Sequence, residues 1–377
     1  MCIRDRLTSG ISFLFKKNKV THIQGLASFV DKNTIKVSSS DGEKNYSAKN
    51  FIIATGSSSI AIDAIPVDEK QIVSSTGALA LESVPKSLLV IGGGYIGLEM
   101  GSVWSRLGSK VTVVEALDRI VPTMDEEIAK EFMKSLKKQG LDFKLSHKVT
   151  STKAGKDGVD VTMESSDNKK VTEKYDVVLM SIGRKPNTEG LNLEEIGVKL
   201  NERKSIEINS KFKTNVDGIY AIGDVVPGPM LAHKAEEEGV ACVELISGQK
   251  PHINYEMIPA IVYTNPEVAS VGKTEAELKA QKIDYKIGKF PFMANGRALT
   301  TSSPEGFVKI LADSKTDAIL GAHIIGHDAG QLIAEIVTTM EFGGSSEDIA
   351  RICHAHPTTS EAVKEAAMNI EGRAIHI

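Results

Sequence analysis

Residues 86–115 read KSLLVIGGGYIGLEMGSVWSRLGSKVTVVE, and the rest of the chain is organised around this stretch. An apolar run at 88–91 ends in three consecutive glycines, and a helical pattern follows from Tyr95 to Leu107. Gly108 ends that pattern, and a second apolar run ends at Glu115. This order predicts a strand, a glycine turn, a helix and a second strand, as in a parallel α/β unit.

Three glycines of this stretch, Gly92, Gly94 and Gly97, have the G-x-G-x-x-G spacing of a dinucleotide-binding turn. The first allows a tight turn, the second lets a pyrophosphate approach the backbone, and the third lets the helix pack on the strand. The helix N-terminus offers free N–H groups to the phosphates. A purely structural glycine turn is the alternative. Glu115 would accept hydrogen bonds from ribose hydroxyls and repel a 2′-phosphate, which favours NAD over NADP, although the nearby Arg119 leaves NADP open.

The composition limits the class of protein. With 377 residues the chain is expected to form two or three domains. The net charge of −4 argues against a nucleic-acid surface, and no apolar run is long enough to predict a membrane-spanning segment. The three cysteines, Cys2, Cys242 and Cys353, have neither a close pairing nor metal-ligand spacing, so we expect no metal site, no structural disulfide and a reducing compartment.

Hydrophobic periodicity outlines most of the remaining chain. We expect helices at 7–19, 125–139 and 232–246, buried strands at 51–54 and 177–182, an apolar strand at 219–222 and a further strand at 141–145. Alternating patterns at 20–30, 34–38 and 44–48 predict a small antiparallel sheet, and Asp167 with Asn168 predicts a hairpin turn. Residues 57–86 show few strong periods and are interpreted as a connector.

The sequence TNVDGIYAIGD at 214–224 places Gly223 and Asp224 at the carboxyl end of an expected strand. In open α/β sheets, ligands bind beyond the carboxyl ends of the strands. Asp224 could therefore bind a sugar or polyol hydroxyl. It could equally cap the helix expected at 232–246, and the local sequence does not decide between these two roles.

The last third of the chain changes to an α+β pattern. We expect strands at 260–263, 268–271, 308–311 and 319–325, and helices at 274–281 and 330–342. The apolar runs and the long apolar helix exceed what one sheet face needs, which predicts a dimer interface.

Residues 353–361, CHAHPTTSE, combine two histidines with a carboxylate. Thr358 and Glu361 have the spacing of a capping box, so Glu361 could serve only to cap a helix starting at Thr358 or Thr359. Alternatively, Glu361 could orient His356 and raise its basicity as an acid–base pair. The two roles are compatible. Cys353, a single thiol, is expected to be a packed side chain.

Six segments together resemble, in order and spacing, the flavin-dependent pyridine nucleotide–disulfide oxidoreductases. They are IIATGS (52–57), VSSTGAL (73–79), GGGYIGLEMGSVWSRLG (92–108), SIGRKPNTEGL (181–191), IYAIGDVVPGPMLAHKAEEEG (219–239) and CHAHPTTSE (353–361). The elements VWSRLG and GPMLAHKAEEEG resemble the dihydrolipoamide dehydrogenase branch more than the glutathione reductase branch.

The resemblance implies an α/β fold with two Rossmann-like nucleotide-binding domains, the first incomplete, and a C-terminal α+β dimerisation domain. Residues 1–56 would be the remnant of an FAD-binding domain and 57–187 the NAD-binding domain. Residues 188–254 would form a central domain that completes the FAD site, and 255–377 the interface domain of a homodimer.

The resemblance also implies roles for individual residues. The residues expected to contact NAD are Gly92, Gly93, Gly94, Tyr95, Ile96, Gly97, Leu98, Glu99, Glu115, Val149 and Gly183. Those expected to contact FAD are Gly25, Ala54, Thr55, Gly56 and Ser57 near its adenosine, Asp224 at the ribityl chain, and Met230, Leu231, Ala232 and His233 beside the isoalloxazine ring. His356, oriented by Glu361, would be the acid–base residue and would reach into the partner subunit's site, whereas His354 would be structural. Tyr95 could cover the flavin near the nicotinamide or simply pack.

The implied chemistry passes electrons from dihydrolipoamide to a redox-active cysteine pair, then to FAD, and finally as hydride to NAD⁺. The implied partners are lipoyl domains of 2-oxo acid dehydrogenase complexes or of the glycine cleavage system, in the cytoplasm or the mitochondrial matrix. The family's first G-x-G-x-x-G and its C-x4-C pair followed by a lysine, the expected partner of Glu99, do not occur in these 377 residues. We therefore expect an N-terminally truncated chain that binds NADH, binds FAD weakly or not at all, and has no lipoamide activity. The alternatives are another FAD/NAD(P)-dependent disulfide reductase and a non-catalytic NAD-binding dimerising module.

Overall fold

The structure is a computed structural model that describes residues 2–377. The chain forms two compact units, and each unit is built from two separate segments. Unit 1 contains the residues up to Ser57 together with Pro186–Pro251, and unit 2 contains Ser58–Lys185 together with His252–Ile377. The division into four domains stays a prediction.

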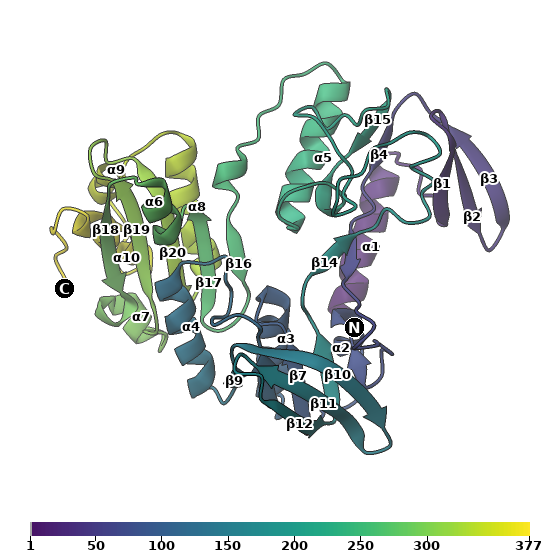
Figure 1. The fold of residues 1–377 in the computed structure, drawn as a ribbon. Coiled ribbons are helices and arrows are strands. Elements are labelled where there is room, and N and C mark those ends of the chain that lie inside the picture. The colour runs from purple at the N-terminus through teal and green to yellow at the C-terminus, as the bar shows by residue number, and fades with distance from the viewer. Residues whose placement is uncertain (1) are drawn as a thin grey trace. The chain divides into compact units, whose positions relative to one another are not determined.

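Unit 1 begins with helix α1 (Cys2–Lys17) and an antiparallel sheet of β1 (Leu26–Asp31), β2 (Thr34–Ser39) and β3 (Gly42–Ser47) (Figure 1). The predicted strand at 20–30 is too long, because pairing with β2 starts only at Leu26. Strand β4 (Phe51–Ile53) pairs in parallel with β15 (Ile219–Ala221), and both segments were expected to be strands. Helix α5 (Ala232–Ile246) has the predicted bounds. The core of the unit includes Phe29, Ile53, Ile206, Ile219 and Val225.

The first part of unit 2 contains a five-stranded sheet in the order β6-β13-β7-β8-β9, in which every pair is parallel. Its strands are β6 (Ile72–Val73), β7 (Ser87–Ile91), β8 (Lys110–Val114), β9 (Asp142–Lys144) and β13 (Val177–Met180). Helices α3 (Tyr95–Arg106) and α4 (Glu126–Lys138) connect β7 to β8 and β8 to β9 (Figure 1). The strand–turn–helix–strand unit predicted for 86–115 is confirmed, with Gly108 following the end of α3.

The segment interpreted as a connector at 57–86 contributes more than expected. It contains β5 (Ser57–Ser59), the sheet strand β6 and the short helix α2 (Ser75–Ala78), and β5 pairs with β14 (Arg184–Pro186). A strand of two residues is too short to show a period, which explains why the sequence pattern did not reveal β6. The hairpin turn expected at Asp167 and Asn168 is confirmed. It joins β11 (Gly158–Ser165) to β12 (Lys170–Tyr175) in a sheet with β10 (His147–Gly155).

The second part of unit 2 is an antiparallel sheet in the order β16-β17-β20-β19-β18. Its strands are β16 (Ala260–Val262), β17 (Glu267–Gly272), β18 (Tyr285–Pro291), β19 (Phe307–Asp313) and β20 (Ile319–Gly326). Its helices are α6 (Glu275–Gln281), α7 (Gly296–Thr300), α8 (Ala329–Glu341), α9 (Ser346–Arg351) and α10 (Glu361–Asn369). Helix α8 packs on β17 and β20, and α10 packs on β18 and β19. Strand β18 was not predicted, and α10 starts at Glu361 rather than at Thr358 or Thr359.

The fold class expected from the sequence is therefore confirmed as a mixed α/β structure with a parallel nucleotide-binding-type sheet and a C-terminal α+β part. Among the described residues 2–377, no helix has both the length and the apolar character that crossing a membrane requires.

Candidate nucleotide-binding and acid–base sites

The glycine turn between β7 and α3 is packed on one side and open on the other. Gly92 has a φ of +105°, and a Cβ at this position would lie 2.5 Å from the carbonyl oxygen of Ser181. A Cβ at Gly97 would lie only 2.3 Å from the carbonyl oxygen of Gly92, so α3 presses directly on the turn. At Gly94, the N-cap of α3, no described atom outside Gly94 and its two chain neighbours lies within 4 Å of an added Cβ. The turn therefore leaves the N-terminus of α3 accessible to an anionic group.

The carboxylate of Glu115 is fixed beside this turn, directly after the end of β8. Its two oxygens accept hydrogen bonds from the backbone N–H groups of Gly93, at 2.7 Å, and Leu117, at 2.9 Å. A carboxylate has about four lone-pair sites, so capacity remains for ribose hydroxyls. Arg119 donates a hydrogen bond to the carbonyl of Pro122 at 3.0 Å, which engages this guanidinium within its own loop.

The other residues predicted to contact NAD differ in accessibility. Leu98 and Val149 are buried in hydrophobic clusters, so their side chains are covered by protein. Ile96 is half-buried in the first turn of α3, and Gly183 follows the end of β13. Tyr95 is half-buried, and its hydroxyl lies 3.2 Å from Thr123 Oγ1.

Glu99 in α3 has a partner that the sequence did not suggest. Its Oε1 accepts a hydrogen bond from the backbone N–H of Tyr263 at 2.8 Å. Burial raises the pKa of Glu99, and this hydrogen bond lowers it by a smaller amount, so the pKa stays above the ordinary value. Glu99 thus contacts the residue that directly follows β16 of the C-terminal sheet.

In unit 1, parallel pairing of β4 with β15 brings two distant segments to one sheet edge. The hydroxyl of Ser57 donates to Oδ2 of Asp224 at 2.6 Å, and the neighbouring Thr55 hydroxyl donates to the carbonyl of Asn187 at 2.7 Å. Asp224 lies in the 3₁₀ turn Gly223–Val225, whereas Leu231 is the N-cap of α5. The alternative in which Asp224 caps that helix is therefore wrong.

The remaining residues predicted to contact FAD lie around these elements. Ala54 and Gly56 belong to the segment that follows β4, with Gly56 accepting a backbone hydrogen bond from Asn187 at 2.9 Å. Gly25 precedes β1, where a Cβ would come within 2.5 Å of Val37 Cγ1. The other four members lie at the start of α5: Met230, Leu231, Ala232 and His233.

A buried ion pair on α5, which the sequence reasoning missed, fixes the backbone before Asp224. Lys234 Nζ lies 3.0 Å from Glu238 Oε1, and both side chains are 1% exposed. Glu238 accepts from the N–H of Gly223 at 2.7 Å, and Lys234 donates to the carbonyl of the same residue at 3.1 Å. The available signal was the i,i+4 spacing of Lys234 and Glu238 on a helix that also buries Ala241.

His356 and Glu361 are in direct contact. His356 Nδ1 lies 3.0 Å from Oε1 of Glu361, and the backbone N–H of Thr358 donates to Oε2 of Glu361 at 2.9 Å. Partial burial tends to raise the pKa of Glu361, but the Thr358 hydrogen bond and the interaction with His356 outweigh it and lower the pKa. The side chain of His356 is 79% exposed. Glu361 therefore accepts the Thr358 N–H and orients an exposed imidazole at the same time. The capping box expected for Thr358 and Glu361 is wrong, because α10 begins at Glu361 after the N-cap Ser360 and the Thr358 hydroxyl donates to the carbonyl of Ala355.

The neighbouring residues behave differently from His356. His354 has a side chain that is only 6% exposed, and its Nε2 lies 2.6 Å from Glu335 Oε1. Cys353 is exposed, so the expectation that it is a packed side chain is wrong for the chain described. The reason is the segment 352–357 that follows α9, in which all residues except His354 are exposed.

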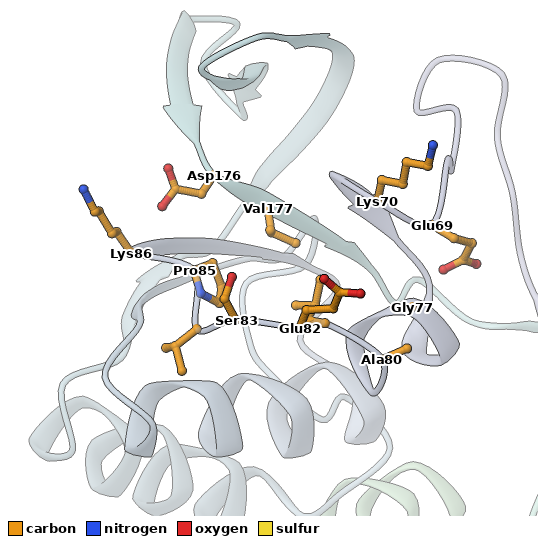
Figure 2. A pocket seen from close by; sticks show the side chains of 12 residues that line it. Glu69, Lys70, Gly77, Ala80, Glu82, Ser83, Pro85, Lys86, Asp176 and Val177 are labelled. Carbon is orange, nitrogen blue, oxygen red and sulfur yellow. The ribbon is translucent and has the colours of Figure 1, made fainter.

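A cavity of about 600 Å³ lies at the opposite edge of the parallel sheet. Figure 2 shows Lys86, Glu82, Lys70 and Asp176 around it. Lys86 immediately precedes β7, and Asp176 immediately precedes β13, so this cavity is at the amino ends of these strands. Ligands of open α/β sheets bind at the carboxyl ends, where the glycine turn lies. The cavity is thus separate from the candidate nucleotide site.

Comparison with known proteins gives concordant matches over both units. The sequence model described as pyridine nucleotide-disulphide oxidoreductase matches residues 3–239, and the model of the dimerisation domain of the same family matches residues 258–367. The mitochondrial dihydrolipoyl dehydrogenase of Pisum sativum is 56% identical, over 99% of this chain and 75% of that protein. Leghemoglobin reductase of Glycine max is also 56% identical, over 97% of this chain and 70% of that protein.

Solved structures agree with the sequence comparison. LpdA of Mycobacterium tuberculosis superposes with a TM-score of 0.90 at 26% identity, over 98% of this chain and 81% of that chain. The HOCl-induced flavoprotein disulfide reductase RclA of Escherichia coli superposes with a TM-score of 0.85 at 26% identity, over 96% of this chain and 84% of that chain.

Proposed function

Because this chain belongs to the pyridine nucleotide–disulphide oxidoreductase family, we propose that it supplies the NAD site, part of the FAD site and the acid–base pair of a dihydrolipoyl dehydrogenase. That reaction oxidises dihydrolipoamide to lipoamide and reduces NAD⁺ to NADH. The observation that carries the proposal is the glycine turn, where the N-terminus of α3 is open at Gly94 and the carboxylate of Glu115 is fixed beside it.

The nucleotide turn has the shape and the charge that NAD requires. The first-turn N–H groups of α3 would bind the pyrophosphate, and the space at Gly94 would let it approach the backbone. Glu115 would accept hydrogen bonds from the ribose hydroxyls, and its negative charge disfavours the 2′-phosphate of NADP. The other members of the NAD-contacting set would act through their backbone or line the approach: Gly92, Gly93, Tyr95, Ile96, Gly97, Leu98, Glu99, Val149 and Gly183.

The edge formed by β4 and β15 fits a flavin nucleotide. Asp224 accepts a hydrogen bond from Ser57, and the backbone just before it is fixed by the bond from the Gly223 N–H to Glu238. Its carboxylate would accept hydrogen bonds from ribityl hydroxyls. Gly25 and the segment after β4 would lie near the adenosine, and the start of α5 would flank the isoalloxazine ring. FAD, when bound, supplies the chemistry that takes electrons from a dithiol and passes them to NAD⁺ as hydride.

His356 would act on the dithiol substrate. An imidazole that accepts a thiol proton favours the thiolate, which is the species that attacks a disulfide. Glu361 would hold the ring through Nδ1, leaving Nε2 of the exposed side chain to exchange the proton. A homodimer is supported by the match of residues 258–367 to the dimerisation domain. In it, His356 would serve the site of the partner subunit.

The first experiment is a titration of the purified chain with NADH, followed by nicotinamide fluorescence. We expect saturable binding, and no NADH-dependent reduction of lipoamide, because the sequence contains no C-x4-C pair. Absence of NADH binding would overturn the proposed nucleotide site. Lipoamide reduction by this chain would contradict the expected inactivity, and flavin released on denaturation would show that FAD is retained more strongly than we expect.

A second candidate function is a non-catalytic NAD-binding dimerising module, which the absence of a C-x4-C pair favours. The two candidates differ in their partners. A dihydrolipoyl dehydrogenase is expected to bind lipoyl domains, in the cytoplasm or the mitochondrial matrix, whereas a simple module is not. Sedimentation of the chain with and without a lipoylated domain tests this difference. The sedimentation of the chain alone tests the homodimer, which should have twice the mass of one chain.

A further inference from the structure

The segment between β8 and α4 forms one wall of the glycine turn. The backbone N–H of Val121 donates to the carbonyl of Gly93 at 2.9 Å, and the hydroxyl of Thr123 lies 3.2 Å from that of Tyr95. A Cβ at Gly93 would lie 3.0 Å from Ile120 Cγ2. Val121 is fully buried and has a φ of +38°, a conformation that a β-branched residue rarely adopts. The segment therefore needs support from its surroundings to keep this shape.

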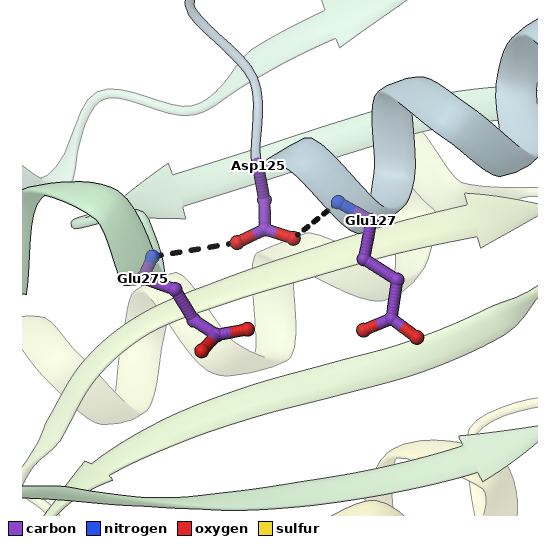
Figure 3. A group of neighbouring side chains, drawn as sticks. All are labelled: Asp125, Glu127 and Glu275. Carbon is purple, nitrogen blue, oxygen red and sulfur yellow. Dashed lines mark hydrogen bonds between the residues drawn. The ribbon is translucent and has the colours of Figure 1, made fainter.

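That support lies at Asp125, where the segment enters α4. Asp125 is buried and caps α4 by accepting the N–H of Glu127 at 3.1 Å, while its second oxygen accepts the N–H of Glu275 at 3.3 Å. Figure 3 shows the Asp125 carboxylate between the N-terminal ends of α4 and α6, with both hydrogen bonds. Helix α6 belongs to the C-terminal α+β part of unit 2. The end of the segment is thus tied to a part of the chain far from it in sequence.

Lys309 on β19 also connects Asp125 to Glu275. Its side chain is 0% exposed, and its Nζ lies 2.9 Å from Asp125, 3.2 Å from Glu127 and 2.6 Å from Glu275. These three carboxylates lie within 4.8 Å of one another. The ammonium group sits within hydrogen-bonding distance of all three carboxylates, so this cluster is an ion network centred on a lysine and not an open cation site.

The charges around Lys309 are balanced by its neighbours. Lys289 pairs with Glu127 and Lys279 pairs with Glu275, so three lysines face three carboxylates. Burial tends to raise the pKa of Glu275, but hydrogen bonds from Lys309, Tyr285 and Lys279 lower it to about 2. The buried His323 ring also faces this network, and burial lowers its pKa. Removing Lys309 would leave the buried carboxylate of Asp125 next to the half-buried carboxylate of Glu275 without the ammonium group between them.

We propose that Lys309 is a positioning residue for the nucleotide site. Through Asp125 it holds residues 119–125 in the shape that places Val121 and Thr123 against the glycine turn, and so it sets the affinity for NAD(H). The role in NAD(H) affinity rests on the proposed function. The consequence is that a residue in the segment matched to the dimerisation domain contributes to the binding of a ligand that it does not touch.

The experiment compares the parent chain with Lys309→Met and with Lys286→Met. Lys286 is on the adjacent strand β18 and pairs with Glu371 at the surface, so its replacement removes the same charge outside the network. We expect Lys309→Met to raise the dissociation constant for NADH about 2–30-fold, the range of couplings transmitted by residues outside a site. Hydrogen exchange at the amides of Val121 and Met124 should accelerate in the same variant. Lys286→Met should change neither quantity.

Each outcome decides the proposal. A folded Lys309→Met chain with parental NADH affinity would overturn it, whatever the exchange at 119–125. If Lys309→Met does not fold, Asp125→Asn replaces it, because asparagine keeps the helix cap but loses the ionic bond. Parental affinity of Asp125→Asn would then overturn the proposal. If the parent itself does not bind NADH, the proposed function fails, and exchange alone decides whether Lys309 positions the segment.

Discussion

The sharpest test of the nucleotide site separates two glycines of the same turn. Gly97→Ala places a methyl group 2.3 Å from the carbonyl oxygen of Gly92, which is backbone and cannot rotate away. Overpacking of this kind costs about 1–3 kcal/mol, and the gain of alanine over glycine within a helix returns about 0.5–1 kcal/mol. The difference spans about 0–2.5 kcal/mol, and from its middle we expect Gly97→Ala to destabilise the parallel-sheet part of unit 2 by about 1 kcal/mol.

Gly94→Ser should separate binding from stability. The new Cβ meets no described atom outside residue 94 and its two chain neighbours within 4 Å, and serine can cap α3 where alanine would cap poorly. Stability should stay within about 0.5 kcal/mol of the parent. The side chain occupies the space through which a pyrophosphate would approach. An overpacking cost of about 1–3 kcal/mol at that point corresponds to NADH binding that is about 5–150-fold weaker.

The protein carries its own probe for this experiment. Trp104, the single tryptophan of the chain, lies on α3 and is 9% exposed, so its fluorescence reports unfolding of the helix that both variants touch. Denaturant unfolding and NADH titration are measured on the parent and both variants. Parental NADH affinity in Gly94→Ser would refute the assignment of the pyrophosphate to the N-terminus of α3. Parental stability in Gly97→Ala would refute the close contact between helix and turn.

Three further predictions concern charges and thiols. Glu275→Gln should destabilise the chain at neutral pH, and because the carboxyl pKa is lowered from 4.5 to about 2, the parent should lose this advantage as pH falls from about 4.5 towards 2 in urea unfolding. Lys234→Met leaves the carboxylate of Glu238 buried without its ionic partner and should cost about 3–5 kcal/mol, whereas replacing both residues with apolar side chains should cost much less. A thiol reagent should modify the exposed Cys353 in the native chain but Cys242 only after unfolding. Cys242 is buried, and burial together with the charge of Glu238 raises the pKa of its thiol to about 11. Mass spectrometry identifies the modified residue.

Local signals were enough to predict most elements of the fold. The bounds of α5 follow from its periodicity, and α4 lies within the helix expected at 125–139. Strands β4 and β15 are parallel, so their carboxyl ends lie at the same end of the pair. The polar and glycine residues that follow the two apolar runs, Thr55-Gly56 and Gly223-Asp224, therefore come together there. Strand β18 was not predicted, because its lysines and its terminal proline are typical of a loop. It becomes a strand through its pairing with β19.

The long-range partners could not be predicted, because they depend on the tertiary fold. A lysine within the predicted apolar strand at 308–311 gives no indication that its ammonium will meet carboxylates from two other elements. The same holds for Glu99, whose acceptor role towards the Tyr263 amide needs the C-terminal sheet to be placed first. The contact between His356 and Glu361 was within reach of the sequence, since both lie in one short turn.

Unit 1 is built from two segments that are far apart in sequence, so it cannot fold until the second segment has been translated. Ser57 and Asp224, which meet at the edge of β4 and β15, are 167 residues apart. A ribosome adding about 5–20 residues per second needs roughly 8–33 seconds to synthesise that interval. During this time β4 has emerged without its partner strand, and its apolar side chains are uncovered. Slower translation would prolong this exposure, so the yield of folded protein should depend on growth temperature and on chaperones that shield β4 until β15 arrives.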